Sequence, residues 1–157
     1  MNSLERRIAD LEAYIRVAEL KAEYLGLCDS GYDGSAIAEL FTEDGSWASN
    51  TYPEAHGRAR IADFMTQIGT SVFAWATHFV GNPRITVDAE AGSATGRWTL
   101  LQLATEGDRS VLAVGDYRDR FRCDDGIWRF SSVRLDLTFV GDVRQGWAAG
   151  SPGLLPT

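Results

Sequence analysis

The sequence has little cysteine, no excess of basic residues and no long apolar run, and each absence excludes a class of protein. Its two cysteines, Cys28 and Cys123, are too few for a disulfide framework and lack the CxxC spacing of zinc or redox sites. The 15 lysines and arginines, set against 22 acidic residues, give a formal net charge of -7 and no basic stripe for nucleic acid. No run of about 18 apolar residues could span a membrane, and residues 1–7 lack the apolar core of a signal peptide. We therefore expect a cytoplasmic protein that binds neither nucleic acid nor membrane.

Motifs for nucleotide and metal chemistry are also missing. The sequence contains no glycine-rich phosphate loop, no GxSxG elbow and no HExxH pattern. Residues 29–40 superficially resemble a calcium loop, but the third position is Gly31 and the twelfth is Leu40, where a bidentate glutamate is required. We therefore predict no metal site.

The content that is present suits one folded domain with helices first and strands afterwards. A chain of 157 residues with 45% hydrophobic and 11% aromatic content can bury a sizeable core, so we predict a single domain over residues 1–157. Apolar residues at helical spacing predict helices over residues 4–29 and 58–68, with a short helix between them. From Thr77 onward, alternating β-branched and aromatic residues predict four long antiparallel strands. This order indicates an α+β fold with helices packed on one face of a curved sheet.

The first predicted helix carries an acidic residue on its apolar stripe. The stripe consists of Leu4, Ile8, Leu11, Ile15, Ala18, Ala22, Leu25 and Asp29. A carboxylate there should point toward the interior, where an unpaired charge is costly, so Asp29 needs a partner. Two histidines are candidates of the pH-responsive kind, His56 beside a loop glycine and His78 in an apolar, aromatic segment. We prefer His78 and interpret His56 as structural or exposed.

Simpler structural roles stay open for these residues. Asp29 stands among turn formers and could merely cap a turn. A lone histidine in apolar surroundings, as His78 is, is most often a core residue with a satisfied hydrogen bond. Tyr24, about 140° from Asp29 around the helix, could border the same cavity or place its hydroxyl in water.

The last predicted strand, residues 127–140, is apolar on both faces for much of its length. Outward-facing apolar residues would be Leu112, Val114, Trp128, Phe130 and Val140. This is more apolar surface than a monomer usually exposes, so we expect a homo-oligomer.

The C-terminal tail, residues 141–157, is rich in glycine and proline. It also holds Trp147, Leu154 and Leu155, which a purely solvated tail would not need. We therefore expect the tail to close over the pocket mouth as a lid or to pack on a neighbouring subunit.

Several short segments, taken in order, resemble the SnoaL-like family of the nuclear transport factor 2-like fold. The segments are Tyr24 with Asp29, residues 40–44, Gly57-Arg58, Thr77-His78 followed by Asn82-Pro83, and residues 125–130. The resemblance covers roughly residues 14–140. It implies a cone-shaped, mostly antiparallel sheet, N-terminal helices over its concave face, and a deep apolar pocket in which Asp29 meets His78.

The trio Tyr24, Asp29 and His78 is similar to that of scytalone dehydratase, bile-acid dehydratase and hexachlorocyclohexane dehydrochlorinase, which are cofactor-free lyases. The resemblance implies no cofactor and a small apolar or polycyclic substrate. It also implies that the expected homo-oligomer is a trimer rather than a dimer. In this reading His78 removes a proton, Asp29 orients the imidazole, Tyr24 assists, and a beta leaving group departs. The dehydrochlorinase has a pocket arginine where this chain has Val133, and Arg134 should face the other way, so hydroxyl is the preferred leaving group.

The aromatic content supplies candidate pocket walls. They are Trp47, Phe64, Phe73, Trp75, Trp98, Tyr117 and Phe139, with Val133 at the arginine position. Two other functions stay open: a ketosteroid-isomerase-like or polyketide-cyclase-like enzyme, and a binding module without catalysis. Possession of both Asp29 and His78 favours catalysis, because a binding module has no use for a buried carboxylate.

Overall fold

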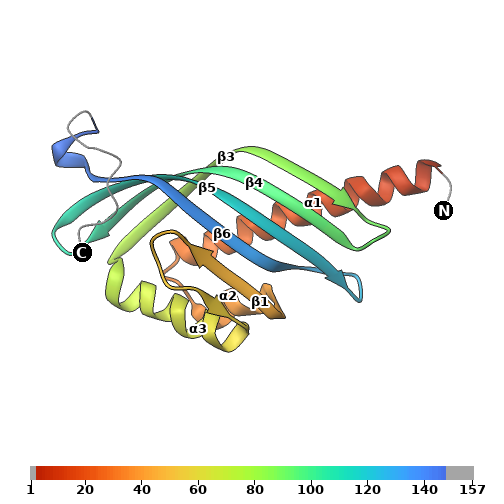
Figure 1. Cartoon of the computed structure of the whole chain (residues 1–157), viewed down its shortest axis with the longest axis horizontal. Helices are drawn as coiled ribbons and strands as arrows, with labels where there is room; N and C mark the ends of the chain where they lie inside the picture. The colour runs from red at the N-terminus through yellow and green to blue at the C-terminus, as the bar shows by residue number, and fades with distance from the viewer. Residues whose placement is uncertain (1–2, 148–157) are drawn as a thin grey trace.

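The computed structural model describes residues 3–147 and has helices packed over one face of a curved sheet (Figure 1). In chain order the elements are α1 (Ser3–Asp29), α2 (Gly34–Glu39), β1 (Phe41–Ser49), β2 (Ala55–His56), α3 (Arg58–Gln67), β3 (Trp75–Asp88), β4 (Ser93–Glu106), β5 (Arg109–Asp124) and β6 (Ile127–Asp142). A π-helical turn, η1 (Ile68–Val72), follows α3, and a 3₁₀ turn, η2 (Val143–Gln145), follows β6. The predicted α+β class and the four long antiparallel strands are confirmed.

The sheet has the strand order β2-β1-β6-β5-β4-β3 and stays open. Neighbouring strands are antiparallel except β1 and β6, which are parallel. As the period-two pattern predicts, Ala113 and Tyr117 of β5 are buried on the concave face and Arg118 is exposed on the other. α1 packs against β3 and β6, and α3 packs against β1, so the helices cover the concave face.

α1 is one unbroken helix whose buried face differs from the predicted stripe. Its buried residues are Ala13, Val17, Leu20, Lys21, Tyr24, Leu25 and Cys28. The predicted inward residues that are exposed instead are Leu4, Ile8, Leu11, Ile15 and Ala22. The first turns of α1 reach past the β3–β4 turn, so no sheet lies beneath them (Figure 1). Where the sheet does lie beneath the helix, the face that carries Tyr24 and the aliphatic stem of Lys21 packs inward. This face buries more apolar area than the predicted stripe would.

β6 contains a β-bulge near its end. Val114 pairs with Phe139 and Gly115 pairs with Leu137, which leaves Thr138 as the extra residue. A bulge reverses the alternation of the residues that follow it. Phe139 therefore faces the outer side of the sheet and Val140 the concave side, opposite to the predictions for both.

A second bulge lies earlier in β6. Arg120 pairs with Ser132 and Phe121 pairs with Phe130, which leaves Ser131 unpaired. Phe130 is fully buried on the concave face, with its ring 4.8 Å from that of Phe121. Trp128 also packs against the core. The prediction that Trp128 and Phe130 lie on the outer face is therefore wrong.

Two further findings concern membrane-spanning helices and the C-terminal tail. Among residues 3–147, no helix combines the length and the apolar character that crossing a bilayer requires. Trp147, the last described residue, is exposed. Leu154 and Leu155, on which the predicted lid also rests, lie outside the described residues.

Candidate active site

Asp29 and His78 meet where the end of α1 packs against β3. Asp29 is the last residue of α1, and its Oδ1 lies 2.6 Å from His78 Nδ1. The same oxygen accepts the backbone N–H of His78 at 3.0 Å. Oδ2 accepts the hydroxyl of Thr77 at 3.3 Å. The contact predicted from the sequence is present, and Asp29 gains several donors rather than one.

The hydrogen bonds of His78 fix its tautomer. A carboxylate accepts hydrogen bonds, so Nδ1 carries the hydrogen and Nε2 presents a lone pair. The His78 side chain is 4% exposed and that of Asp29 is 31% exposed. Burial lowers the pKa of His78 and outweighs the hydrogen bond and the charge of Asp29, which raise it. The imidazole is therefore neutral near pH 7 and able to accept a proton.

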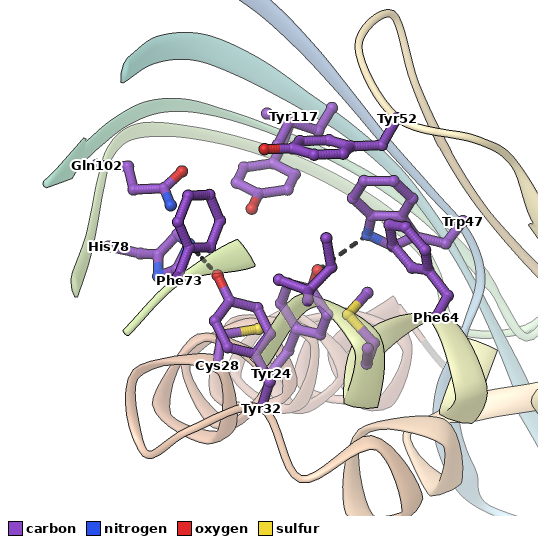
Figure 2. Close-up of a pocket in the computed structure, with 13 residues that line it drawn as sticks. Tyr24, Cys28, Tyr32, Trp47, Tyr52, Phe64, Phe73, His78, Gln102 and Tyr117 are labelled. Atoms are coloured by element: carbon purple, nitrogen blue, oxygen red, sulfur yellow. Dashed lines mark hydrogen bonds between the residues drawn. The ribbon is translucent and has the colours of Figure 1, made fainter. Parts of the chain in front are cut away.

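The lone pair of His78 meets Tyr32, a residue that sequence analysis missed. Tyr32 Oη lies 3.3 Å from His78 Nε2, and Figure 2 shows this contact as a dashed line. Tyr32 has a left-handed backbone (φ 58°) directly after Gly31 (φ 104°), and this turn directs its ring back toward β3. Burial raises the pKa of Tyr32 above its ordinary value, so the hydroxyl stays protonated and donates to Nε2.

Tyr24 faces the same cavity from α1. Its hydroxyl oxygen accepts the indole N–H of Trp47 at 2.9 Å, and both side chains are buried (Figure 2). Accepting this bond leaves the hydroxyl hydrogen of Tyr24 able to donate. Burial also raises the pKa of Tyr24, so the group is a neutral donor. Tyr24 lines the cavity as predicted, whereas Asp29 reaches it through His78.

The cavity between the helices and the sheet is narrow and mostly apolar. It is lined by Tyr24, Cys28, Tyr32, Trp47, Tyr52, Phe64, Met65, Ile68, Phe73, His78, Gln102, Tyr117 and Leu135 (Figure 2). Its volume is about 30 Å³. A cavity that holds a benzene ring measures about 150 Å³, so a cyclic ligand has to displace side chains here.

Half of the predicted wall residues line this cavity. Those that do are Trp47, Phe64, Phe73 and Tyr117. Those that do not are Trp75, Trp98, Val133 and Phe139.

Each misplaced wall residue has a structural reason. Trp75 is 53% exposed because it lies one residue from the buried Ala76, on the opposite face of β3. Trp98 is buried away from the cavity, edge-on to Phe121. Val133 is part of the core beside β1. Phe139 follows the bulge at Thr138 and faces outward.

Sequence analysis missed more than half of the lining residues. The missed residues are Cys28, Tyr32, Tyr52, Met65, Ile68, Gln102 and Leu135. Gln102 had a usable signal, since it is a polar residue between inward-facing Leu100 and Ala104. Tyr32 and Tyr52 lie in connecting segments, where no periodicity indicates direction.

Two cationic residues, Lys21 and Arg134, each pair with an aspartate. Lys21 Nζ lies 2.8 Å from Asp119 Oδ2, with both side chains fully buried, and 3.2 Å from the centre of the Tyr117 ring. Arg134 is on the outer face, as predicted, and it pairs with Asp136. Of the lysines and arginines in the described part of the chain, none lines the cavity. Residues 3–147 also hold no group of three or more His, Cys, Asp or Glu that could bind a metal ion.

Comparison with known proteins shows the family and the fold of the chain. The SnoaL-like domain family matches residues 9–134, a range that includes Asp29, Tyr32 and His78. The gamma-hexachlorocyclohexane dehydrochlorinase of Sphingobium indicum is 24% identical over 132 residues, which cover 83% of this chain and 81% of that protein. An NTF2-like protein of cystatin-like fold from Novosphingobium aromaticivorans is 29% identical, with a TM-score of 0.75 and coverage of 98% of this chain and 96% of that one. A candidate scytalone dehydratase from the same species is 23% identical, with a TM-score of 0.77 and coverage of 87% and 91%.

Proposed function

We propose that this chain, which belongs to the SnoaL-like domain family, is a cofactor-independent lyase that removes water from an apolar cyclic molecule. The observation that carries the proposal is a buried, neutral imidazole whose Nδ1 is held by a carboxylate and whose Nε2 faces an apolar cavity. Relatives named dehydrochlorinase and scytalone dehydratase support lyase chemistry at the level of the family.

The proposed reaction begins with proton transfer to His78. When substrate binds, the Tyr32 hydroxyl turns from Nε2 to the leaving group, which frees the Nε2 lone pair. Nε2 then takes the proton from a carbon next to a carbonyl group, and Asp29 stabilises the imidazolium that forms. Tyr24 donates its hydroxyl hydrogen bond to the carbonyl oxygen, where negative charge develops. Tyr32 gives its proton to the hydroxyl group that leaves from the neighbouring carbon, which departs as water. The proton on Nε2 then passes to the oxygen of Tyr32, and both groups return to their starting state.

The charges around the cavity favour hydroxyl over chloride as the leaving group. A departing chloride gains most from a nearby cation, and Lys21 is already paired with Asp119. A departing hydroxyl needs a proton instead. Neutral tyrosines supply protons, and Tyr24 and Tyr32 both line the cavity.

The test uses 3-hydroxytetralone, a two-ring β-hydroxy ketone that becomes 1-naphthol on loss of water. The wild-type protein should produce 1-naphthol, followed by its fluorescence, and should exchange the hydrogen next to the carbonyl with deuterated solvent. His78→Ala and Asp29→Asn should each slow the reaction by about a hundredfold to ten-thousandfold. Circular dichroism and thermal unfolding should show that both variants keep the fold.

His56→Ala is the matched control, because His56 is exposed and contacts Glu54. This variant should react at the wild-type rate. Equal deuterium exchange by wild type and His78→Ala would remove His78 from the mechanism. A rearranged ketone without loss of water would indicate an isomerase, and binding without exchange would indicate a binding module.

A further inference from the structure

A second cavity lies beside the first on the concave face of the sheet. It has a volume of about 10 Å³, and its floor includes Ala113 and Val140. Tyr52, Phe73 and Gln102 line both cavities. These three side chains therefore stand between the two spaces.

Strand register places both cavities over one row of the sheet. His78 pairs with Gln102, Gln102 with Ala113, and Ala113 with Val140, from β3 across to β6. His78 lines the first cavity, Gln102 lines both, and the other two residues line the second. Neighbouring strands lie about 4.8 Å apart, so this row of four residues is about 14 Å long. The row is long enough for a ligand that extends well beyond one ring.

The residues at the floor of the row lie on paired strands. The two aromatic side chains that separate the cavities, Tyr52 and Phe73, lie in connecting segments. Gln102 and Ala113 lie on strands that are paired on both sides, and Val140 pairs with Ala113 beyond the end of the β1–β6 pairing. Tyr52 lies between β1 and β2, and Phe73 lies between η1 and β3. Both aromatic side chains are half-buried, and connecting segments move more readily than paired strands. The π-helical turn directly before Phe73 is of a kind that recurs at functional sites.

Tyr52 borders a third space, an outer groove of about 480 Å³. The groove is lined by charged residues that include Glu54, Arg60 and Asp63, as suits an entrance from water. The second cavity is lined by apolar side chains together with Gln102 and Glu106, and the Glu106 carboxylate is paired with Arg109. The apolar part of this lining suits the body of a ligand. Tyr52 is thus the side chain that meets the groove and both cavities. Figure 2 shows its hydroxyl pointing toward the side of the cavity that holds Gln102.

We infer that Tyr52 and Phe73 form a movable partition, and that the substrate is an elongated, apolar molecule with three fused rings in line. Its reactive end lies at His78. Its far end lies over Ala113 and Val140 once the two aromatic side chains have moved aside. This inference rests on the proposed function for the reactive end and names the shape of the substrate.

The test measures binding of two unreactive fluorescent probes, naphthalen-2-ol with two rings and anthracen-2-ol with three rings in line. The wild-type protein should bind anthracen-2-ol at least tenfold more tightly. Ala113→Leu fills the second cavity, so it should weaken anthracen-2-ol at least tenfold and naphthalen-2-ol less than twofold. Val114→Leu is the control at the next residue: it adds one methylene on the outer face and should change neither affinity.

Two further variants keep the inference testable if Ala113→Leu fails to fold. Val140→Phe fills the same cavity from the neighbouring strand and should give the same selective loss. Tyr52→Ala removes part of the partition and should raise the association rate of anthracen-2-ol at least tenfold. Equal losses for both probes, no loss for either, or an unchanged association rate would overturn the inference.

The probes carry no leaving group, so their binding does not depend on catalysis. An inactive protein with length-selective binding would reject the lyase proposal and support the elongated site. An active protein whose variants lose no length selectivity would support the lyase proposal and reject the elongated site.

Discussion

His78 accepts a proton only while its ring is neutral, so its pKa sets the pH range of the reaction. Burial lowers this pKa below the value of about 6.5 for an exposed histidine. We expect kcat/KM for 3-hydroxytetralone to be constant near pH 7 and to fall on acidification, with a midpoint below about pH 6.5. A pH–rate profile measures this midpoint. A value above that of an exposed histidine would contradict the burial of the ring.

Tyr32 contacts the reactive nitrogen of His78, and its role as proton donor can be separated from packing. Tyr32→Phe keeps the ring and removes the hydroxyl that lies 3.3 Å from Nε2. We expect kcat to fall by about tenfold to a hundredfold, with KM changed less than twofold, because the proton is needed in the transition state.

Tyr14→Phe is the control for the Tyr32 substitution, since Tyr14 lies on α1 and is 40% exposed. It should leave both kinetic constants unchanged. A rise in KM at constant kcat for Tyr32→Phe would assign Tyr32 to ligand binding instead.

The sequence predicted the Asp29–His78 contact, although part of the reasoning was wrong. Asp29 was placed on the buried stripe of α1, but the buried face ends at Cys28 and Asp29 lies at its border. The contact still forms because an acid next to the buried face can reach a histidine on the strand beneath. Tyr32 could not be found in this way, because its direction depends on a left-handed turn that is not periodic.

At the scale of the element, two glycines in helices should respond in opposite ways to alanine. Gly26 lies inside α1, and a Cβ added there would meet nothing within 4 Å. Gly26→Ala should raise the free energy of unfolding by about 0.5–1 kcal/mol, because alanine loses less backbone entropy in a helix. Gly34→Ala should lower it, since a Cβ at the start of α2 would collide with the carbonyl oxygen of Ala62.

Urea unfolding measures both glycine variants under the same conditions. The pair controls for the general effect of glycine replacement, because both residues become alanine in a helix. A loss of stability in Gly26→Ala would contradict the open space around the position of the added Cβ.

The strands show why sequence patterns predict some elements better than others. β5 alternates regularly over its length, so its inward and outward residues were assigned correctly. β6 has extra residues at Ser131 and Thr138, and each reverses the alternation. A bulge leaves little trace in composition, so Phe130 and Phe139 were assigned to the wrong faces.

At the scale of the whole molecule, the outer face of the sheet carries an apolar row directly behind the site. Phe79 pairs with Leu101, Leu101 with Val114, and Val114 with Phe139. Phe79 and Leu101 are exposed. The homo-oligomer expected from the sequence stays a prediction, and this row replaces Trp128, Phe130 and Val140 as its contact face.

The helical layer and the sheet are joined beneath the site by the buried pair of Lys21 and Asp119, which lie on α1 and β5. Burial lowers the pKa of Lys21 and raises that of Asp119, and the partner's charge opposes each shift. The second oxygen of the Asp119 side chain, Oδ1, has no hydrogen-bond partner among the described residues. The pair is therefore expensive to bury, and removing one member leaves the other without compensation.

Lys21→Met should lower the free energy of unfolding by about 3–5 kcal/mol, because methionine fills the space of the lysine stem but leaves Asp119 unpaired. The double variant Lys21→Met with Asp119→Leu should recover most of this loss, since an apolar pair of similar volume needs no solvation. Arg16→Met is the control, because Arg16 forms an exposed pair with Glu19, and its loss should cost less than about 1 kcal/mol. Urea unfolding of wild type and these three variants measures the free energy of unfolding of each. If the double variant is no more stable than Lys21→Met, the loss comes from packing of the lysine stem against Tyr117 and not from the stranded charge.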